Sequence, residues 1–134
     1  MIGADTIVLV RYLTRDDEQQ FRAAQAAFQA ARRGHEPLYV GIPVLLETVW
    51  VLQRAYDADR SGVAKAIDAL LDSSDIILEQ EALVESALDA FKTGAADFAD
   101  YVIGLGNRAA GCRHTLTFDD RAARFAAFRA VRGA

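Results

Sequence analysis

The chain has 134 residues, of which 52% are hydrophobic and 25% are charged, and its formal net charge is −4. These values exclude a disordered chain, favour one globular domain over residues 1–134, and disfavour a general nucleic-acid binder, which usually carries a basic surface. Cys112 is the single cysteine, and no long apolar run or basic leader is present, so we expect a cytoplasmic protein without an intrachain disulfide.

Apolar periodicity alternates along the chain between short strand-like segments and longer helix-like segments. The clearest helix is 16–33, which has acidic residues in its first turn, arginines in its last turn and Gly34 just after it. In chain order, the expected elements are a strand at 2–5, helices at 6–13 and 16–33, a strand at 37–42, a helix at 44–56, a helix from Asp59 or Ser61 to 72, a strand at 76–80, helices at 81–94 and 97–111, a strand at 114–118 and a final helix at 120–128.

Short apolar strands separated by helices indicate an α/β fold. We expect a central, mainly parallel sheet of four to five short strands, flanked by helices on both faces. In such sheets ligands bind at the carboxyl ends of the strands, so acids that directly follow strands are the first candidates for a site.

Four carboxylates interrupt or border apolar segments, where a soluble chain normally places apolar residues. They are Asp5, Glu47, Asp100 and Asp119. A carboxylate is rarely buried unless it is paired or binds a metal, and Mg²⁺ and Mn²⁺ favour carboxylate and water ligands. Asp5 and Asp119 follow the first and last expected strands, so we expect both at one edge of the sheet. The set therefore predicts a divalent-cation site.

Each acid also has a simpler interpretation. Asp5, Asp97 and Asp119 stand where aspartate commonly caps a helix. Glu47 lies inside an apolar helix and could pair with a buried arginine. The prediction of a metal site rests on the four acids together and on no single one of them.

Four segments resemble the PIN domain, and more narrowly the VapC-type toxins of type II toxin–antitoxin systems. They are ADTIVLVRYL (4–13), ETVWVL (47–52), GAADFADYVIG (94–104) and LTFDDRAAR (116–124), in the family's order and over essentially the whole chain. The resemblance implies a PIN-like fold and an endoribonuclease that uses Mg²⁺ or Mn²⁺. It also implies a homodimer that a cognate antitoxin protein inhibits.

Carried over by position, the resemblance implies that the catalytic and metal-binding acids are Asp5, Glu47, Asp100 and Asp119. Asp97, one helical turn before Asp100, is the accessory metal-binding acid of the family. Thr117 stands at the family's hydroxyl position, two residues before the last acid.

One position departs from the family pattern. Ile7 replaces the usual asparagine, whose amide helps to orient the acids, and losing such a contact can cost about 10–100-fold in metal affinity or activity. Thr6 remains and is expected to compensate in part. The departure leaves a second interpretation open, a catalytically impaired PIN-fold module that still binds its antitoxin.

The expected chemistry is hydrolysis of an RNA phosphodiester by a metal-activated water. His35 and His114 lack a catalytic partner, which disfavours a metal-free histidine mechanism. The arginines that flank the acids are candidates for binding substrate phosphates, with solvated or antitoxin-binding charges as the alternative. These arginines are Arg11, Arg121 and Arg124.

Three further interpretations stay open. Tyr101 is the one aromatic residue retained as a candidate for stacking on a base. The apolar faces of 16–33 and 44–52 could hold an antitoxin helix or form a dimer contact. The third is a phosphatase or phosphotransfer domain with Asp5 as the nucleophile or phosphate acceptor, although it leaves Glu47 unexplained.

Overall fold

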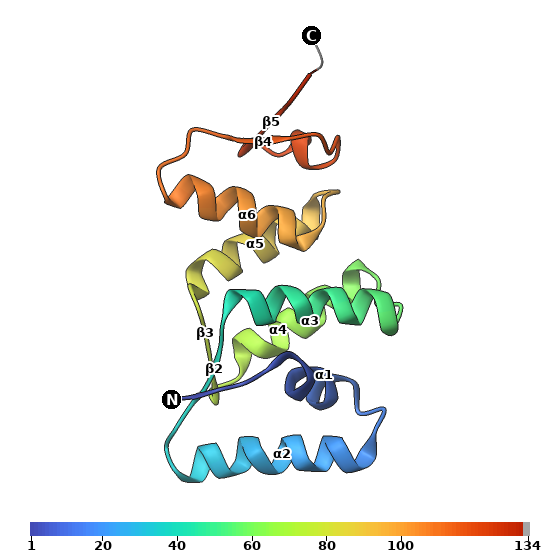
Figure 1. Ribbon diagram of the computed structural model, residues 1–134, viewed down its shortest axis with the longest axis vertical. Helices are drawn as coiled ribbons and strands as arrows, with labels where there is room; N and C mark the ends of the chain where they lie inside the picture. The colour runs from blue at the N-terminus through green and yellow to red at the C-terminus, as the bar shows by residue number, and fades with distance from the viewer. Residues whose placement is uncertain (133–134) are drawn as a thin grey trace. The chain divides into compact units, whose positions relative to one another are not determined.

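The computed structural model describes residues 1–132 and has an α/β fold, as the sequence predicts (Figure 1). Its contacts divide the chain into two compact units, Met1–Glu81 and Ala82–Ala134, which are described separately below. In the described part of the chain, no helix is both long enough and apolar enough to cross a membrane.

The first unit combines a parallel three-stranded sheet with four helices. Its strands pair in the order β1-β2-β3, and Leu38 of the central strand lies opposite Ile2 on one side and Ile76 on the other. The elements are β1 (Ile2–Gly3), α1 (Thr6–Thr14), α2 (Glu18–Arg33), β2 (Leu38–Val40), α3 (Ile42–Ala55), α4 (Arg60–Asp72) and β3 (Ile76–Leu78).

Local signals in the sequence set the helix boundaries of this unit. The Asp17 side chain accepts a hydrogen bond from the Gln20 N–H at 3.0 Å, and the Asp59 side chain accepts one from the Gly62 N–H at 2.7 Å. These caps satisfy N–H groups that the helices themselves leave open. Apolar positions at helical spacing then supply the buried side chains of the core, such as Leu9, Val10, Val63 and Ile67.

The second unit consists of two helices followed by a short parallel β-pair. Its elements are α5 (Glu81–Thr93), α6 (Phe98–Ala109), β4 (Thr115–Thr117), the 3-10 turn η1 (Ala122–Arg124) and β5 (Phe128–Ala130). Phe91 and Phe98 pack edge to face in its core, with ring centroids 5.9 Å apart. Gly104 lets the β5 residue Phe128 lie against α6, because a Cβ at Gly104 would be 2.5 Å from the phenyl ring.

The order and type of nearly all predicted elements are confirmed, and their ends lie within a few residues of the expected ones. Residues 1–132 contain five short strands, all paired in parallel, but these form one group of three and one of two. The predicted final helix at 120–128 is wrong. That segment forms η1 and then enters β5, because Thr115–Thr117 offers Phe128–Ala130 a strand to pair with. Helix propensity is a weak signal that such tertiary pairing overrides.

Candidate active site

Asp5 caps the first helix of the first unit. Its Oδ1 accepts a hydrogen bond from the Thr6 N–H at 2.7 Å, and its side chain is otherwise exposed. The capping interpretation is therefore confirmed, and it leaves the second carboxylate oxygen available. Thr6 itself is buried, and within residues 1–132 its hydroxyl has no hydrogen-bond partner. An unpartnered buried hydroxyl beside an acid is suited to bind a water or a polar ligand group.

Glu47 lies in the middle of α3 but on its exposed side. The next residue, Thr48, is buried and donates from its hydroxyl to the Val44 carbonyl at 2.7 Å. The expectation that Glu47 occupies an apolar position is therefore wrong. Apolar neighbours in the sequence do not determine which face of a helix a residue takes, and an exposed carboxylate needs neither a metal nor an arginine to be stable.

Asp97 and Asp100 lie together at the start of α6. Asp97 is the N-cap, and its N–H donates to Oδ2 of Asp100 at 3.3 Å, in a capping-box arrangement. Partial burial raises the pKa of the Asp100 carboxyl, and the negative charges of Asp97 and Asp119 raise it further. The Asp97 backbone hydrogen bond and the positive charge of Arg121 act in the opposite direction.

Asp119 is held by the turn that follows β4. Its N–H donates to the Thr117 hydroxyl at 3.0 Å, while its Oδ1 accepts from the N–H groups of Arg121 at 2.8 Å and Ala122 at 3.1 Å. These backbone hydrogen bonds, followed by the charge of Arg121, lower the pKa of the Asp119 carboxyl. Thr117 thus orients the backbone at the acid.

The second unit brings three of the predicted acids into one electrostatic group, Asp97, Asp100 and Asp119. In the first unit, Asp5 stands at the start of α1, which packs on the helix that carries Glu47. Taken alone, neither unit contains among its described residues a group of three or more His, Cys, Asp or Glu side chains that could hold a metal. The donor chemistry nevertheless fits a divalent cation, since the carboxylates in the second unit repel one another and a cation would remove that repulsion.

Arg11 and Arg121 differ in how fully they are bonded. The Arg11 guanidinium donates from Nε to Gln20 and from Nη1 to the Tyr56 hydroxyl at 3.0 Å, and it lies 3.7 Å from Asp16. Among the described residues Arg121 forms no ion pair within 4.0 Å, although its charge acts on Asp100 and Asp119. Arg121 is therefore the freer of the two to bind a phosphate.

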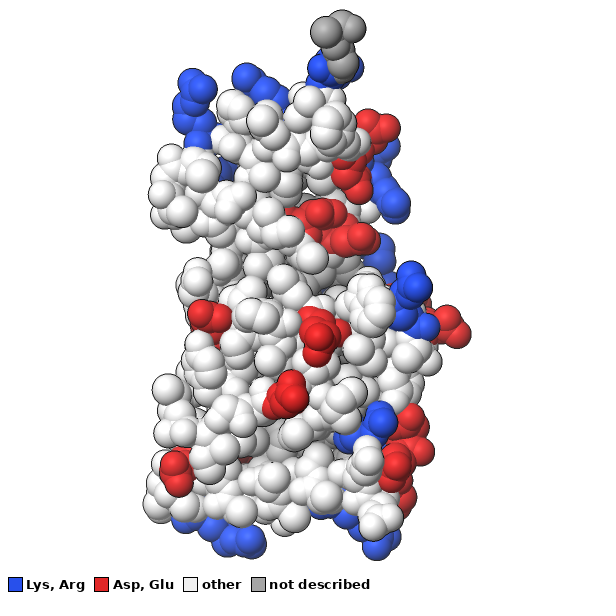
Figure 2. All heavy atoms as spheres, viewed as in Figure 1, with Lys and Arg blue, Asp and Glu red and all other residues white. Residues whose placement is uncertain are grey.

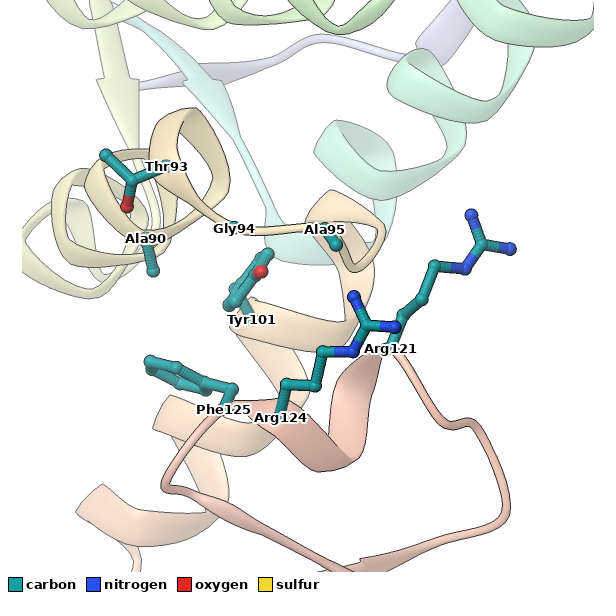
Figure 3. A pocket seen from close by; sticks show the side chains of 8 residues that line it. All are labelled: Ala90, Thr93, Gly94, Ala95, Tyr101, Arg121, Arg124 and Phe125. Atoms are coloured by element: carbon teal, nitrogen blue, oxygen red, sulfur yellow. The ribbon is translucent and has the colours of Figure 1, made fainter.

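Two cavities lie next to predicted site residues, one in each unit. In the second unit a cavity of about 420 Å³ is lined by Arg121, Arg124 and the aromatic residues Tyr101 and Phe125 (Figure 3). In the first unit a cavity of about 330 Å³ beside Asp5 is lined mainly by small apolar side chains of α1 and α2. These are Ile7, Val8, Ala23, Ala24 and Ala27.

Tyr101 is only 2% exposed, so the expectation that it stacks on a base is wrong. Its hydroxyl accepts a hydrogen bond from the Ala96 N–H at 3.2 Å. The sequence alone did not reveal why this ring fits: a Cβ on Gly94 would be 1.8 Å from the Tyr101 hydroxyl. Gly94, which lies shortly before Asp97 and Asp100, is the sequence feature that could have indicated this close approach.

Charged side chains form no single basic band on the face of the described residues that Figure 2 shows. On the face shown in Figure 2, acidic and basic groups of the described residues are interspersed among uncharged ones. This pattern agrees with the net charge of −4.

Comparison with known proteins gives one family and one curated relative. The family model of the PIN domain matches residues 4–128. A "VapC ribonuclease" from Aquifex aeolicus (strain VF5) is 21% identical over 117 residues, which cover 87% of this chain and 86% of the relative. No solved structure matches the chain significantly.

Proposed function

This chain belongs to the PIN domain family, and from that premise we propose that it is an endoribonuclease toxin of a toxin–antitoxin system. The family match carries the proposal, because residues 4–128 include every acid that the resemblance assigns to the site. The similarity to a VapC ribonuclease over 87% of the chain supports RNA as the substrate. The same coverage supports the proposal that both units together make one PIN domain.

We propose that Mg²⁺ or Mn²⁺ is held by Asp5, Glu47, Asp100 and Asp119, with Asp97 as an accessory acid. When bound, such an ion lowers the pKa of a water and neutralises charge on the phosphate. Exposed or half-buried carboxylates suit this role, because they remain accessible to the ion and to RNA.

The chain's own residues position these acids. Thr117 and the N–H groups after Asp119 fix the orientation of that carboxylate and keep it ionised. Asp100 holds its proton more tightly than an ordinary aspartic acid, so a nearby cation would favour its ionised form. Thr6 would supply the supporting hydroxyl beside Asp5, and Arg121 would hold a substrate phosphate. The Nη2 group of Arg11 is a further candidate for a phosphate contact.

We propose that the apolar cavity between α1 and α2 receives a helix of the cognate antitoxin. The small side chains among its lining allow close approach of a helix. Ala27→Glu places a charge in this cavity, so it should abolish inhibition by the co-expressed antitoxin while cleavage by the free toxin is unchanged. Cleavage that is still inhibited would contradict this docking site.

Homodimer formation is a separate proposal. Trp50 on α3 is 57% exposed, and tryptophan is a residue type that is enriched at protein–protein interfaces. Sedimentation velocity at micromolar concentration should show a dimer, and Trp50→Ser should shift it toward monomer. A wild-type chain that sediments only as a monomer would exclude it.

A catalytically impaired binding module remains the second candidate function, and Ile7 favours it. This side chain is 49% exposed and lines the apolar cavity beside Asp5, so an orienting amide is replaced there by a hydrocarbon. The module would bind antitoxin but would show neither metal binding nor cleavage.

Analysis of the cleavage products tests the proposed function. The purified, antitoxin-free chain is incubated with a pool of structured RNAs in Mg²⁺, in Mn²⁺ and in EDTA. Cleavage only with metal, giving ends that ligate as 5′-phosphate and 3′-hydroxyl, is expected. Products with a 2′,3′-cyclic phosphate, or cutting that persists in EDTA, would contradict a metal-activated water.

A further inference from the structure

The cavity of about 420 Å³ in the second unit is built around two arginines of one turn. Arg121 immediately precedes η1 and Arg124 ends it, and in Figure 3 both side chains extend to the same side of that turn. Gly94 and Ala95, in the loop before α6, form the opposite wall. Both arginines therefore line a single cavity.

The positive charge of this cavity is only partly balanced, by the nearby carboxylates of Asp100 and Asp119. Neither arginine forms an ion pair within 4.0 Å in residues 1–132. Both residues are exposed, so an incoming ligand can reach them. Arg121 is also close enough to Asp100 and Asp119 for its charge to affect both carboxyl groups. A negatively charged group held here would therefore lie beside the proposed catalytic acids.

The lining indicates which part of a ligand the cavity can recognise. A guanidinium matches the geometry of a phosphate through two parallel hydrogen bonds. The Tyr101 ring is buried, and it packs edge-on against Phe125 with centroids 5.0 Å apart, so it offers no face for a base to stack on. The volume is within the range of small-ligand sites, about 300–1,000 Å³. The cavity is thus suited to a phosphate and its sugar, and the buried Tyr101 ring is not available to stack on a base.

We propose that Arg121 and Arg124 bind a backbone phosphate of single-stranded RNA next to the bond that is cut, independently of base identity. This inference rests on the proposed RNA cleavage and adds a substrate subsite to it. An extended polyanion fits better than an acidic peptide. The arginines would hold one phosphate, and the neighbouring phosphate would lie toward Asp100 and Asp119, whose negative charge Arg121 partly offsets.

Binding measured without metal tests the subsite separately from catalysis. The probe is a fluorescein-labelled 12-nucleotide single-stranded RNA in EDTA, followed by anisotropy at several salt concentrations. Arg124→Ala should weaken binding about tenfold, as expected for loss of a charged hydrogen bond. It should also reduce the slope of log K against log salt by about 0.7, the value for one phosphate contact on a single strand. Arg124→Lys should restore the slope but only part of the affinity. The matched control is Arg113→Ala, an exposed arginine of the same unit outside the cavity, which should change neither quantity.

A second measurement locates the phosphate. Single linkages of the RNA are replaced in turn by neutral methylphosphonates. In the wild type one position near the cut should weaken binding, and in Arg124→Ala the same replacement should have no further effect. Oligo(A) and oligo(U) should lose equal factors on Arg124→Ala.

Each of the following three outcomes would contradict the proposed phosphate subsite. If the wild type binds and cleaves RNA while Arg124→Ala keeps its affinity and salt slope, the subsite is wrong and the proposed function stands. If Arg124→Ala weakens binding of a polyglutamate peptide but not of RNA, the cavity is a protein-binding surface. If the folded wild type neither binds nor cleaves RNA, the proposed function fails, and the subsite fails with it.

Discussion

The carboxyl group of Asp100 connects stability, pH and metal binding at a single residue. Burial and the charges of Asp97 and Asp119 raise its pKa, so the folded chain holds this proton more tightly than the unfolded chain. The protonated form therefore contributes stability at pH values below the ordinary pKa of aspartic acid. This contribution is lost as the pH rises through the raised pKa of the folded chain. At neutral pH the ionised carboxylate lowers the stability of the metal-free protein.

Asp100→Asn should remove that effect. In EDTA at pH 7 its free energy of unfolding should exceed that of the wild type by under about 1 kcal/mol, because solvent screens a partly exposed carboxyl. Its melting temperature should be higher accordingly. Below about pH 4 the difference should disappear, since the wild-type carboxyl is then protonated. Thermal unfolding monitored by circular dichroism across this pH range gives the comparison.

The same pair of proteins should respond oppositely to metal. At Mg²⁺ equal to ten times its dissociation constant, the wild type should gain about 1.4 kcal/mol by linkage, and Asp100→Asn should gain nothing. If the wild type is less stable than Asp100→Asn at every pH, also in the presence of Mg²⁺, Asp100 does not belong to the proposed metal site.

Ile7→Asn tests whether the departure from the family pattern limits activity. Restoring an amide beside Asp5 should raise metal affinity or cleavage rate about tenfold, the lower end of what such supporting contacts contribute. Isothermal titration with Mn²⁺ and cleavage kinetics measure the two effects. Ile7→Leu keeps the hydrocarbon and should match the wild type. Equal rates for all three proteins would show that Ile7 is not responsible for any weakness of the site.

Among the elements, the junction of α5 and α6 depends on Gly94. A methyl group there would be 1.8 Å from the Tyr101 hydroxyl and 2.9 Å from the Ala90 carbonyl, so Gly94→Ala should cost about 1–3 kcal/mol as an overpacked site. Urea unfolding provides the measurement. Gly106→Ala is the matched control within α6, because its nearest side-chain atom is 3.6 Å away, and it should be neutral or stabilising.

Removing the Tyr101 hydroxyl identifies the cause of that loss. Tyr101→Phe should recover part of the stability in the Gly94→Ala background, since the closest clash is with the hydroxyl oxygen. Simple additivity of the two substitutions would mean that the ring and the glycine do not contact each other in solution.

The helices and strands before residue 119 could be predicted because their signals are local. Caps such as Asp17 and Asp59 and the apolar periodicity lie within each segment. The segment 120–128 could not be predicted, since β5 forms by pairing with β4, a contact between separated stretches of sequence. Its alanines favour a helix only in the absence of that pairing.

The candidate site was predictable to a similar extent. The capping contacts of Asp5, Asp97 and Asp119 follow from their positions before helices or turns, and they are confirmed. The exposure of Glu47 and the burial of Tyr101 were not predictable. Both depend on which helix face packs inward, and in apolar segments such as these the periodicity does not resolve that face.

For the whole molecule, the proposal of one domain predicts that both units unfold together. Phe128→Ala in the second unit should cost about 3 kcal/mol, because the ring is buried against α6. If unfolding is one cooperative transition, slowly exchanging amides of β2 and α6 should lose the same protection in hydrogen–deuterium exchange. Phe118→Ala, at a ring that is 84% exposed, should change neither. If Phe128→Ala lowers hydrogen-exchange protection only in α6, the two units are separate domains.

Metal-dependent RNA cleavage by acids from both units is the central claim, and one cleavage assay tests it most directly. The wild type, Asp5→Asn, Asp100→Asn and the control Asp89→Asn, an exposed acid on α5, are compared in Mn²⁺ and in EDTA. We predict cutting by the wild type and Asp89→Asn with Mn²⁺ only, and loss of at least about 100-fold in both site variants. Full activity of Asp5→Asn or Asp100→Asn, or no cutting by a folded wild type in any metal, would contradict the claim.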